Sequence, residues 1–207
     1  MNEFDPSEAA ALLRQTRSRA QRSLDRRPPL LVLLGAVLFF VAYWGVWWSV
    51  RRQHPYHGPA GWSLGLLYGI IAVWAVSVSF TMRRATAGVG GATRRRGRVE
   101  AVSFTVIWIA VYVFQGSLHH AGASNAIAYG IYPATAPFII VGSAAAARSA
   151  VLEKVRELGV ALALVCLGVG ASFAGAATVW LVMGIGLSAV LFVLAGVQLW
   201  QRRTANA

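Results

Sequence analysis

Charged residues are scarce in this chain of 207 residues, at 13%, and it has one cysteine. Soluble domains contain about 25% charged and about 45–50% apolar residues, whereas this chain is 57% hydrophobic with a mean hydropathy of +0.58. These values exclude a water-soluble globule, and they exclude a disordered chain, which requires low hydrophobicity. The lone Cys166 excludes a disulfide scaffold and a cysteine zinc cage. We therefore expect an all-α, polytopic integral membrane protein.

Ionisable side chains are also missing from the middle of the long apolar stretches, and Glu100 lies only at the entry of one. Ion-coupled transporters, proton pumps and voltage sensors carry such groups at bilayer depth, so these classes are disfavoured. Rhomboid-type proteolysis needs Gly-x-Ser-Gly, and Val141-Gly142-Ser143-Ala144 departs from it. Cys166 has no neighbouring base and is expected to be a small apolar packing residue. The sequence therefore predicts no enzyme and no cofactor.

Six apolar stretches are long enough to cross a bilayer, whose core of about 30 Å needs about 20 helical residues. They are residues 30–50, 61–82, 99–118, 126–147, 158–176 and 178–200. The last two are joined without a polar loop, so we expect a tight turn at Gly175. One six-helix membrane domain, 30–200, thus lies between segment 1–29 and tail 201–207.

Arginine and lysine lie almost entirely on one side of these spans. Of the 19 basic residues, all except Arg51 and Arg52 fall in segment 1–29, in the second or fourth connection, or in the tail. The positive-inside rule then predicts a plasma-membrane protein with both termini in the cytoplasm. We attribute the net charge of +12 to this topology and expect no nucleic-acid partner.

Two of the basic segments have two interpretations each. Asp5, Pro6 and Glu8 form a helix start, which predicts an amphipathic basic helix within 1–29 on the inner leaflet. The second connection ends in Arg94-Arg95-Arg96-Gly97-Arg98. Each segment either docks a cytoplasmic partner or sets the topology while contacting only lipid headgroups of the bilayer.

Gly61, Gly65 and Gly69 form a ladder with a spacing of four residues, which places them on one face of a helix. Such glycines let another helix backbone approach closely in a membrane. The ladder predicts either packing within the bundle or the seam of a homodimer. Weaker stripes of small residues occur in the last three spans: Ala126, Gly130, Ala134, Gly142 and Ala146, then Gly168, Ser172 and Ala176, then Gly184 and Ser188.

The fourth span contains two prolines at a spacing of four, Pro133 and Pro137. Each removes a backbone donor, which frees the carbonyls of Tyr129 and Pro133. In hydrocarbon these carbonyls need new donors, for which we expect tyrosine or serine hydroxyls, Gln115 or water. The span is therefore predicted to be kinked and turned inward, as a substrate path or as a fixed kink. The candidate substrate-path residues are Gln115, Tyr129, Tyr132, Pro133, Thr135 and Pro137.

All four histidines, His54, His57, His119 and His120, fall on the predicted outer face. Neutral imidazoles bind zinc or copper, and histidines also sense pH near neutrality. Every carboxylate is expected on the opposite side, so none can orient such a ligand set. We therefore predict no metal site, with these histidines as the weak candidates for one.

Three strings carry a family resemblance: Ala10–Gln15, Tyr129–Pro137 and Val179–Gly186. Over most of its length the chain resembles uncharacterised small six-span integral membrane proteins of actinobacteria. The resemblance implies the six-span fold. No functional residue carries over from it, because no activity is agreed for that group.

The leading function hypothesis is a permease-like subunit of a transport system that depends on a separate energising partner, such as a cytoplasmic ATPase. Its basis is six spans, the proline-broken span and the absence of an internal energy-coupling group. It is similar to six-span ABC permeases only at fold level. The alternative is a non-transporting scaffold or regulator that docks a cytoplasmic partner through its basic N-terminal helix and second connection.

Overall fold

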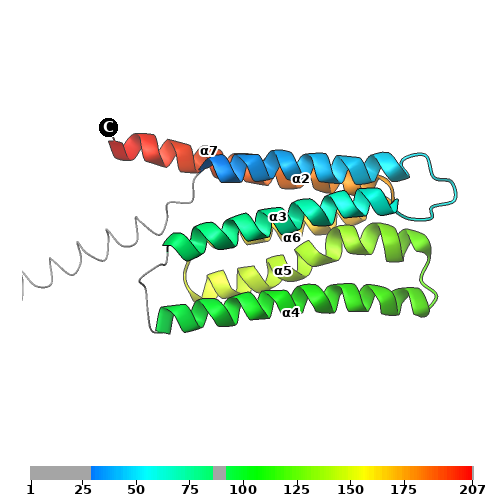
Figure 1. Ribbon diagram of the computed structural model, residues 1–207, viewed down its shortest axis with the longest axis horizontal. Coiled ribbons are helices and arrows are strands. Elements are labelled where there is room, and N and C mark those ends of the chain that lie inside the picture. Colours follow the sequence, from blue (N-terminus) through cyan, green and yellow to red (C-terminus); the bar gives the residue numbers. More distant parts are fainter. Residues whose placement is uncertain (1–28, 86–91, 207) are drawn as a thin grey trace, which may run out of the picture.

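The computed structural model describes residues 29–85 and 92–206, and none of these residues lies in a β-strand. The elements are α2 (Pro29–Val50), α3 (Gly61–Ala85), α4 (Ala92–His120), η1 (Ala126–Ile131), α5 (Tyr132–Val151), α6 (Val155–Ser172) and α7 (Thr178–Asn206). The helices lie roughly parallel to one long axis and alternate in direction (Figure 1). This confirms the all-helical fold class, whereas the predicted amphipathic helix within 1–29 falls outside the described residues.

Five helical segments are long and apolar enough to cross a membrane. They are Leu30–Val50, Ala101–His120, Ala126–Val151, Val155–Ser172 and Thr178–Trp200. The second predicted span corresponds to α3, in which the apolar stretch found among the described residues is Gly61–Ser77. The described residues thus contain five candidate spans and one shorter apolar helix, which fits a multi-pass membrane protein, and the sixth span stays a prediction.

The fifth span ends before its predicted bound, whereas the sixth begins at the predicted residue. Helix α6 ends at Ser172 rather than at residue 176, and α7 begins at Thr178. Between them Gly175 has a φ of 84°, a left-handed conformation that glycine adopts without a steric penalty. The chain therefore reverses over residues 173–177 without a polar loop.

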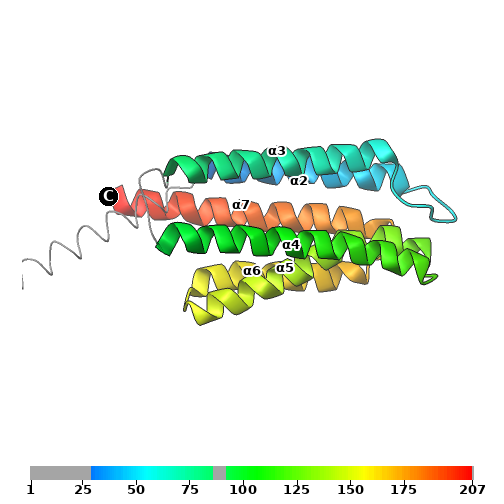
Figure 2. The same ribbon diagram turned by 60° about the horizontal axis from the view of Figure 1, so that its bottom comes forward.

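Helices α2 and α7 form the most extensive helix pair, and α5 and α6 form the next. Figure 2 shows α7 between the α2–α3 pair and the α5–α6 pair. A Cβ atom on Gly184 of α7 would lie 2.8 Å from Cβ of Tyr43 on α2. The Ser188 hydroxyl donates to the Ala36 carbonyl at 2.8 Å, so this buried serine links two helices instead of bonding to its own.

The α5–α6 pair also depends on glycines. A Cβ on Gly142 would lie 2.9 Å from Val165 Cγ2, and a Cβ on Gly168 would lie 2.7 Å from Ile139 Cγ1. Cys166 is exposed, which corrects the expectation of a packing residue. At about 100° per residue, it lies on nearly the opposite side of α6 from Gly168, and Gly168 faces α5.

Helices α3 and α4 lie at the periphery, where α3 packs mainly on α2, and α4 packs on α5 and η1. An edge-to-face contact joins Tyr68 of α3 to Tyr112 of α4, with ring centroids 5.7 Å apart. Trp108 of α4 reaches Phe138 of α5 in the same way, at 6.4 Å. Aromatic contacts therefore attach the outer helices, while small residues bring the inner helices close together.

Candidate functional site

The fourth predicted span is two elements rather than one kinked α-helix. Residues Ala126–Ile131 form a π-helix, and α5 begins at Tyr132 with Pro133 in its first turn. Proline has no backbone N–H. A backbone N–H at position 133 would donate to the Ala128 carbonyl in a π-helix and to the Tyr129 carbonyl in an α-helix. The switch of helix type therefore leaves two neighbouring carbonyls in need of other donors.

Side chains from two other elements supply these donors. The Gln115 amide on α4 donates to the Ala128 carbonyl at 2.9 Å. The Tyr56 hydroxyl, in the connection between α2 and α3, donates to the Tyr129 carbonyl at 3.2 Å. The sequence indicated the Tyr129 carbonyl and Gln115 as a donor. It did not single out Tyr56, for which the sequence showed only a tyrosine in the connection between the first two predicted spans.

Of the remaining candidate residues in the proline-rich segment, residues 129–137, three are buried and Tyr132 is partly exposed. Pro133, Thr135 and Pro137 are buried, and Thr135 is 3% exposed. The Thr135 hydroxyl donates to the Ile131 carbonyl at 2.8 Å. The Tyr132 hydroxyl donates to the Val111 carbonyl of α4 at 3.1 Å. The structure therefore brings the predicted residues together, with these hydroxyls bonded to backbone rather than directed into an open channel.

The loop at residues 51–60 covers this segment at one end of the bundle. Gln53 organises the loop, because its amide donates to the Gly58 carbonyl at 3.0 Å and its oxygen accepts from the His57 N–H at 3.1 Å. The Trp180 indole donates to the Tyr56 hydroxyl at 3.4 Å. Burial raises the pKa of Tyr56, and the Trp180 bond offsets part of that rise. Tyr56 therefore remains a protonated donor at neutral pH.

The four histidines lie at the same end of the bundle, and all four are exposed. The His119 ring lies 5.2 Å from the Tyr129 ring and 6.2 Å from the His120 ring. Within residues 29–85 and 92–206, no three His, Cys, Asp or Glu side chains are grouped so as to hold a metal ion. His119 therefore makes an aromatic contact with Tyr129 of the proline-rich segment.

The glycine ladder of α3 faces away from the rest of the bundle. A Cβ on Gly61, Gly65 or Gly69 would have nothing within 4 Å, and all three residues are exposed. Within the described residues, no helix therefore packs against the glycine face of α3. Self-association along α3 stays a prediction.

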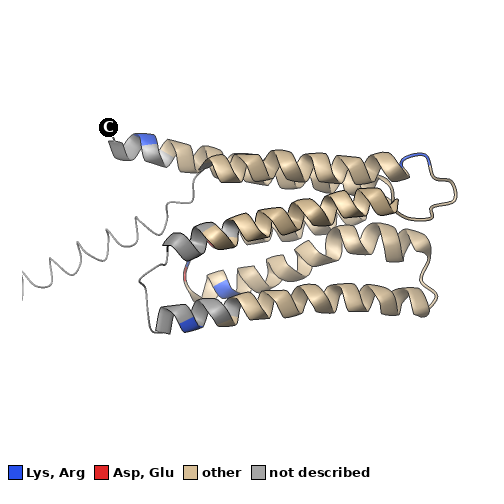
Figure 3. Ribbon diagram, in the orientation of Figure 1, with Lys and Arg blue, Asp and Glu red and all other residues tan. Residues whose placement is uncertain are grey.

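Basic residues mark both ends of the bundle, as Figure 3 shows. Arg95 near the start of α4, Arg148 in the last turn of α5 and Arg203 in the last turn of α7 lie at one end, by the alternating direction of these helices. Arg51 and Arg52 follow α2 at the other end. Segment 1–28 and residues 86–91, part of the basic second connection, lie outside the described residues.

The site therefore consists of a proline-rich helix start held by donors from α4 and from the loop at residues 51–60. The bonds that define it join side-chain donors to backbone carbonyls. No family model, no curated protein and no solved structure matches this chain.

Proposed function

We propose that the chain is a non-transporting membrane scaffold or regulator that docks a cytoplasmic partner through its basic end. The observation that supports this proposal best is the closed state of the proline-rich segment. Thr135 is 3% exposed, and the Gln115 and Tyr56 donors are already bonded to backbone carbonyls. A solute on a path through this segment would have to displace those bonds.

The docking surface in this proposal combines segment 1–29 with the second connection. Both are rich in arginine in the sequence, and Arg95, Arg148 and Arg203 belong to the same end of the bundle. Such a field favours an acidic partner and depends on ionic strength, because salt screens exposed charges over about 8–10 Å. The proposal places this end, and both termini, in the cytoplasm at the plasma membrane.

The experiment is cross-linking in native membranes followed by affinity purification and mass spectrometry. A variant with Arg94→Gln, Arg95→Gln and Arg96→Gln is compared with the wild type and with Arg51→Gln/Arg52→Gln, which removes charge at the opposite end. We expect one acidic protein to be lost with the first variant and retained with the second. Loss with both, or retention with both, would contradict docking through the basic end.

A second candidate, the permease-like transport subunit with a separate energising ATPase, is favoured by one observation. The π-helix η1 ends two residues before Pro133, and π-helical segments are frequent at functional sites. In this proposal the Tyr56 and Gln115 bonds would break during transport and expose the Thr135 side of α5. Thiol accessibility at Thr135, described in the Discussion, separates the two candidates.

A further inference from the structure

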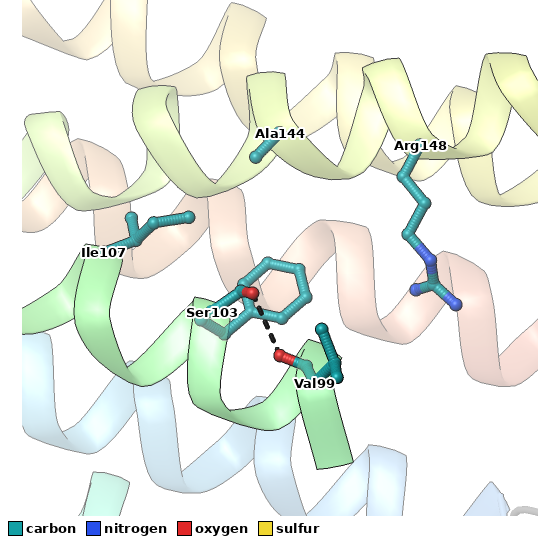
Figure 4. A pocket seen from close by; sticks show the side chains of 6 residues that line it. Val99, Ser103, Ile107, Ala144 and Arg148 are labelled. Carbon is teal, nitrogen blue, oxygen red and sulfur yellow. Dashed lines mark hydrogen bonds between the residues drawn. The ribbon is translucent and has the colours of Figure 1, made fainter. Parts of the chain in front are cut away.

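A cavity of about 210 Å³ opens between α4 and α5, away from the proline-rich segment. Figure 4 shows the side chains that line it: Val99, Ser103, Phe104, Ile107, Ala144 and Arg148. Four of these six residues are hydrocarbon or aromatic. The fifth, Ser103, donates its hydroxyl to the Val99 carbonyl at 2.9 Å. The wall is therefore apolar in character, with one cationic side chain.

Arg148 stands at one end of this groove. It belongs to the last turn of α5, and Ala144 lies one helical turn deeper. On the facing helix, Val99 and Ile107 are eight positions apart, which corresponds to about 12 Å at 1.5 Å per residue. The groove thus runs from the basic end of the bundle down into the apolar zone, with the guanidinium at the shallow end.

The position of the groove limits what can occupy it. Its α4 wall borders the exterior of the bundle, where Val99 is 58% exposed. An occupant therefore comes from the bilayer rather than from water. A guanidinium carries five N–H donors, so it can bind phosphate oxygens while keeping a contact within the protein. Basic pockets between transmembrane helices bind anionic lipid headgroups.

From this geometry we propose that the α4–α5 groove binds an anionic phospholipid from the leaflet at the basic end. The Arg148 guanidinium holds the phosphate, and an acyl chain lies along Phe104, Ile107 and Ala144. The selectivity for an anionic over a zwitterionic lipid comes from the Arg148 charge, to which Arg95 at the start of α4 adds at the same end of the bundle. This inference is independent of whether the protein is a scaffold or a transporter.

The test uses the full-length protein purified in a neutral detergent. Native mass spectrometry counts retained lipids, and thermal unfolding is followed with added dioleoylphosphatidylglycerol or dioleoylphosphatidylcholine at equal mole fraction. The variants are Arg148→Gln, which removes the charge, and Ala144→Phe, which fills the groove without changing charge. Arg203→Gln is the control, because it removes one charge at the same end of the bundle outside the groove.

We expect phosphatidylglycerol to raise the melting temperature of the wild type more than phosphatidylcholine does. Arg148→Gln and Ala144→Phe should each lose this difference and at least one retained phosphatidylglycerol, while Arg203→Gln should keep both. Should Arg148→Gln fail to fold, Ala144→Phe and Arg148→Lys carry the test. Equal effects of the two lipids, or an unchanged difference in Ala144→Phe, would overturn the proposal. Equal stabilisation by inorganic phosphate would assign the site to a free anion instead.

Discussion

The hydroxyl of Tyr56 lies 3.2 Å from the carbonyl oxygen of Tyr129 and donates a hydrogen bond to it. These residues are 73 positions apart, one in the loop between α2 and α3 and the other in the π-helix before α5. The bond satisfies a carbonyl that Pro133 cannot serve. It therefore ties the covering loop to the irregular part of the bundle, and the predictions below begin with it.

Replacing Tyr56 with Phe should destabilise the protein by about 1–3 kcal/mol. The change leaves the Tyr129 carbonyl without this donor and removes the acceptor of the Trp180 indole, and buried polar groups without partners cost that much. Unfolding in detergent, followed by tryptophan fluorescence, measures the loss. His57→Ala, an exposed change in the same loop, is the control. A melting temperature unchanged in Tyr56→Phe would show that water replaces the hydroxyl.

Gln115→Leu should also destabilise the protein, because it removes the donor to the Ala128 carbonyl. Leucine preserves most of the volume but cannot donate to the Ala128 carbonyl, which leaves about 1–3 kcal/mol of lost stability. Ser117→Ala is a matched change on the same helix, since its hydroxyl only contacts the Val113 carbonyl at 3.4 Å. If the two variants lose equal stability, the Gln115 bond does not support the π-helix.

Thiol accessibility at Thr135 distinguishes a sealed kink from a transport path. In a Cys166→Ala background, Thr135→Cys should not react with a membrane-impermeant charged thiol reagent, because the side chain is 3% exposed. The replacement of Cys166 is required, since that thiol is itself exposed. His57→Cys provides the reactive control. Labelling of Thr135→Cys in any nucleotide or pH condition would favour the permease-like candidate over the scaffold.

Two glycine substitutions should behave in opposite ways. Gly184→Ala places a Cβ 2.8 Å from Cβ of Tyr43 and should cost about 1–3 kcal/mol by overpacking. Gly65→Ala meets nothing within 4 Å and should leave the melting temperature of a monomer nearly unchanged.

The same site tests self-association. Gly65→Leu adds bulk on the open face of α3, so a dimer seam along the ladder should be lost while the fold persists. Size-exclusion chromatography with light scattering reports the oligomeric state. A dimer that survives Gly65→Leu rules out this ladder as its seam.

Reporter fusions test the orientation. A reporter active only in the cytoplasm should be active after Arg203 and when inserted at Gly90, and silent at Gly58 and Gly122. The reason is the excess of arginine on the side that contains both termini. Activity at Gly58 combined with silence at Gly90 would mean that the topology is inverted.

The amino-acid sequence by itself determined the class of the protein and most of its helices. Long apolar runs without charges have one solution in lipid, the helix, because every backbone group must be bonded internally. The same rule indicated that the Tyr129 carbonyl needs a donor, since the position of a proline fixes which carbonyls it frees.

Only the tertiary structure decided which side chains donate to the freed carbonyls and which glycines contact a neighbouring helix. Stripes of small residues look alike in a sequence, yet Gly142, Gly168 and Gly184 meet a neighbouring helix and the more regular ladder of Gly65 does not. The reason is that contact depends on which face each helix turns to its neighbours. Likewise, the Tyr56–Tyr129 hydrogen bond and the groove beside Arg148 each bring together segments that are distant in the sequence. A local sequence pattern does not reveal such long-range contacts.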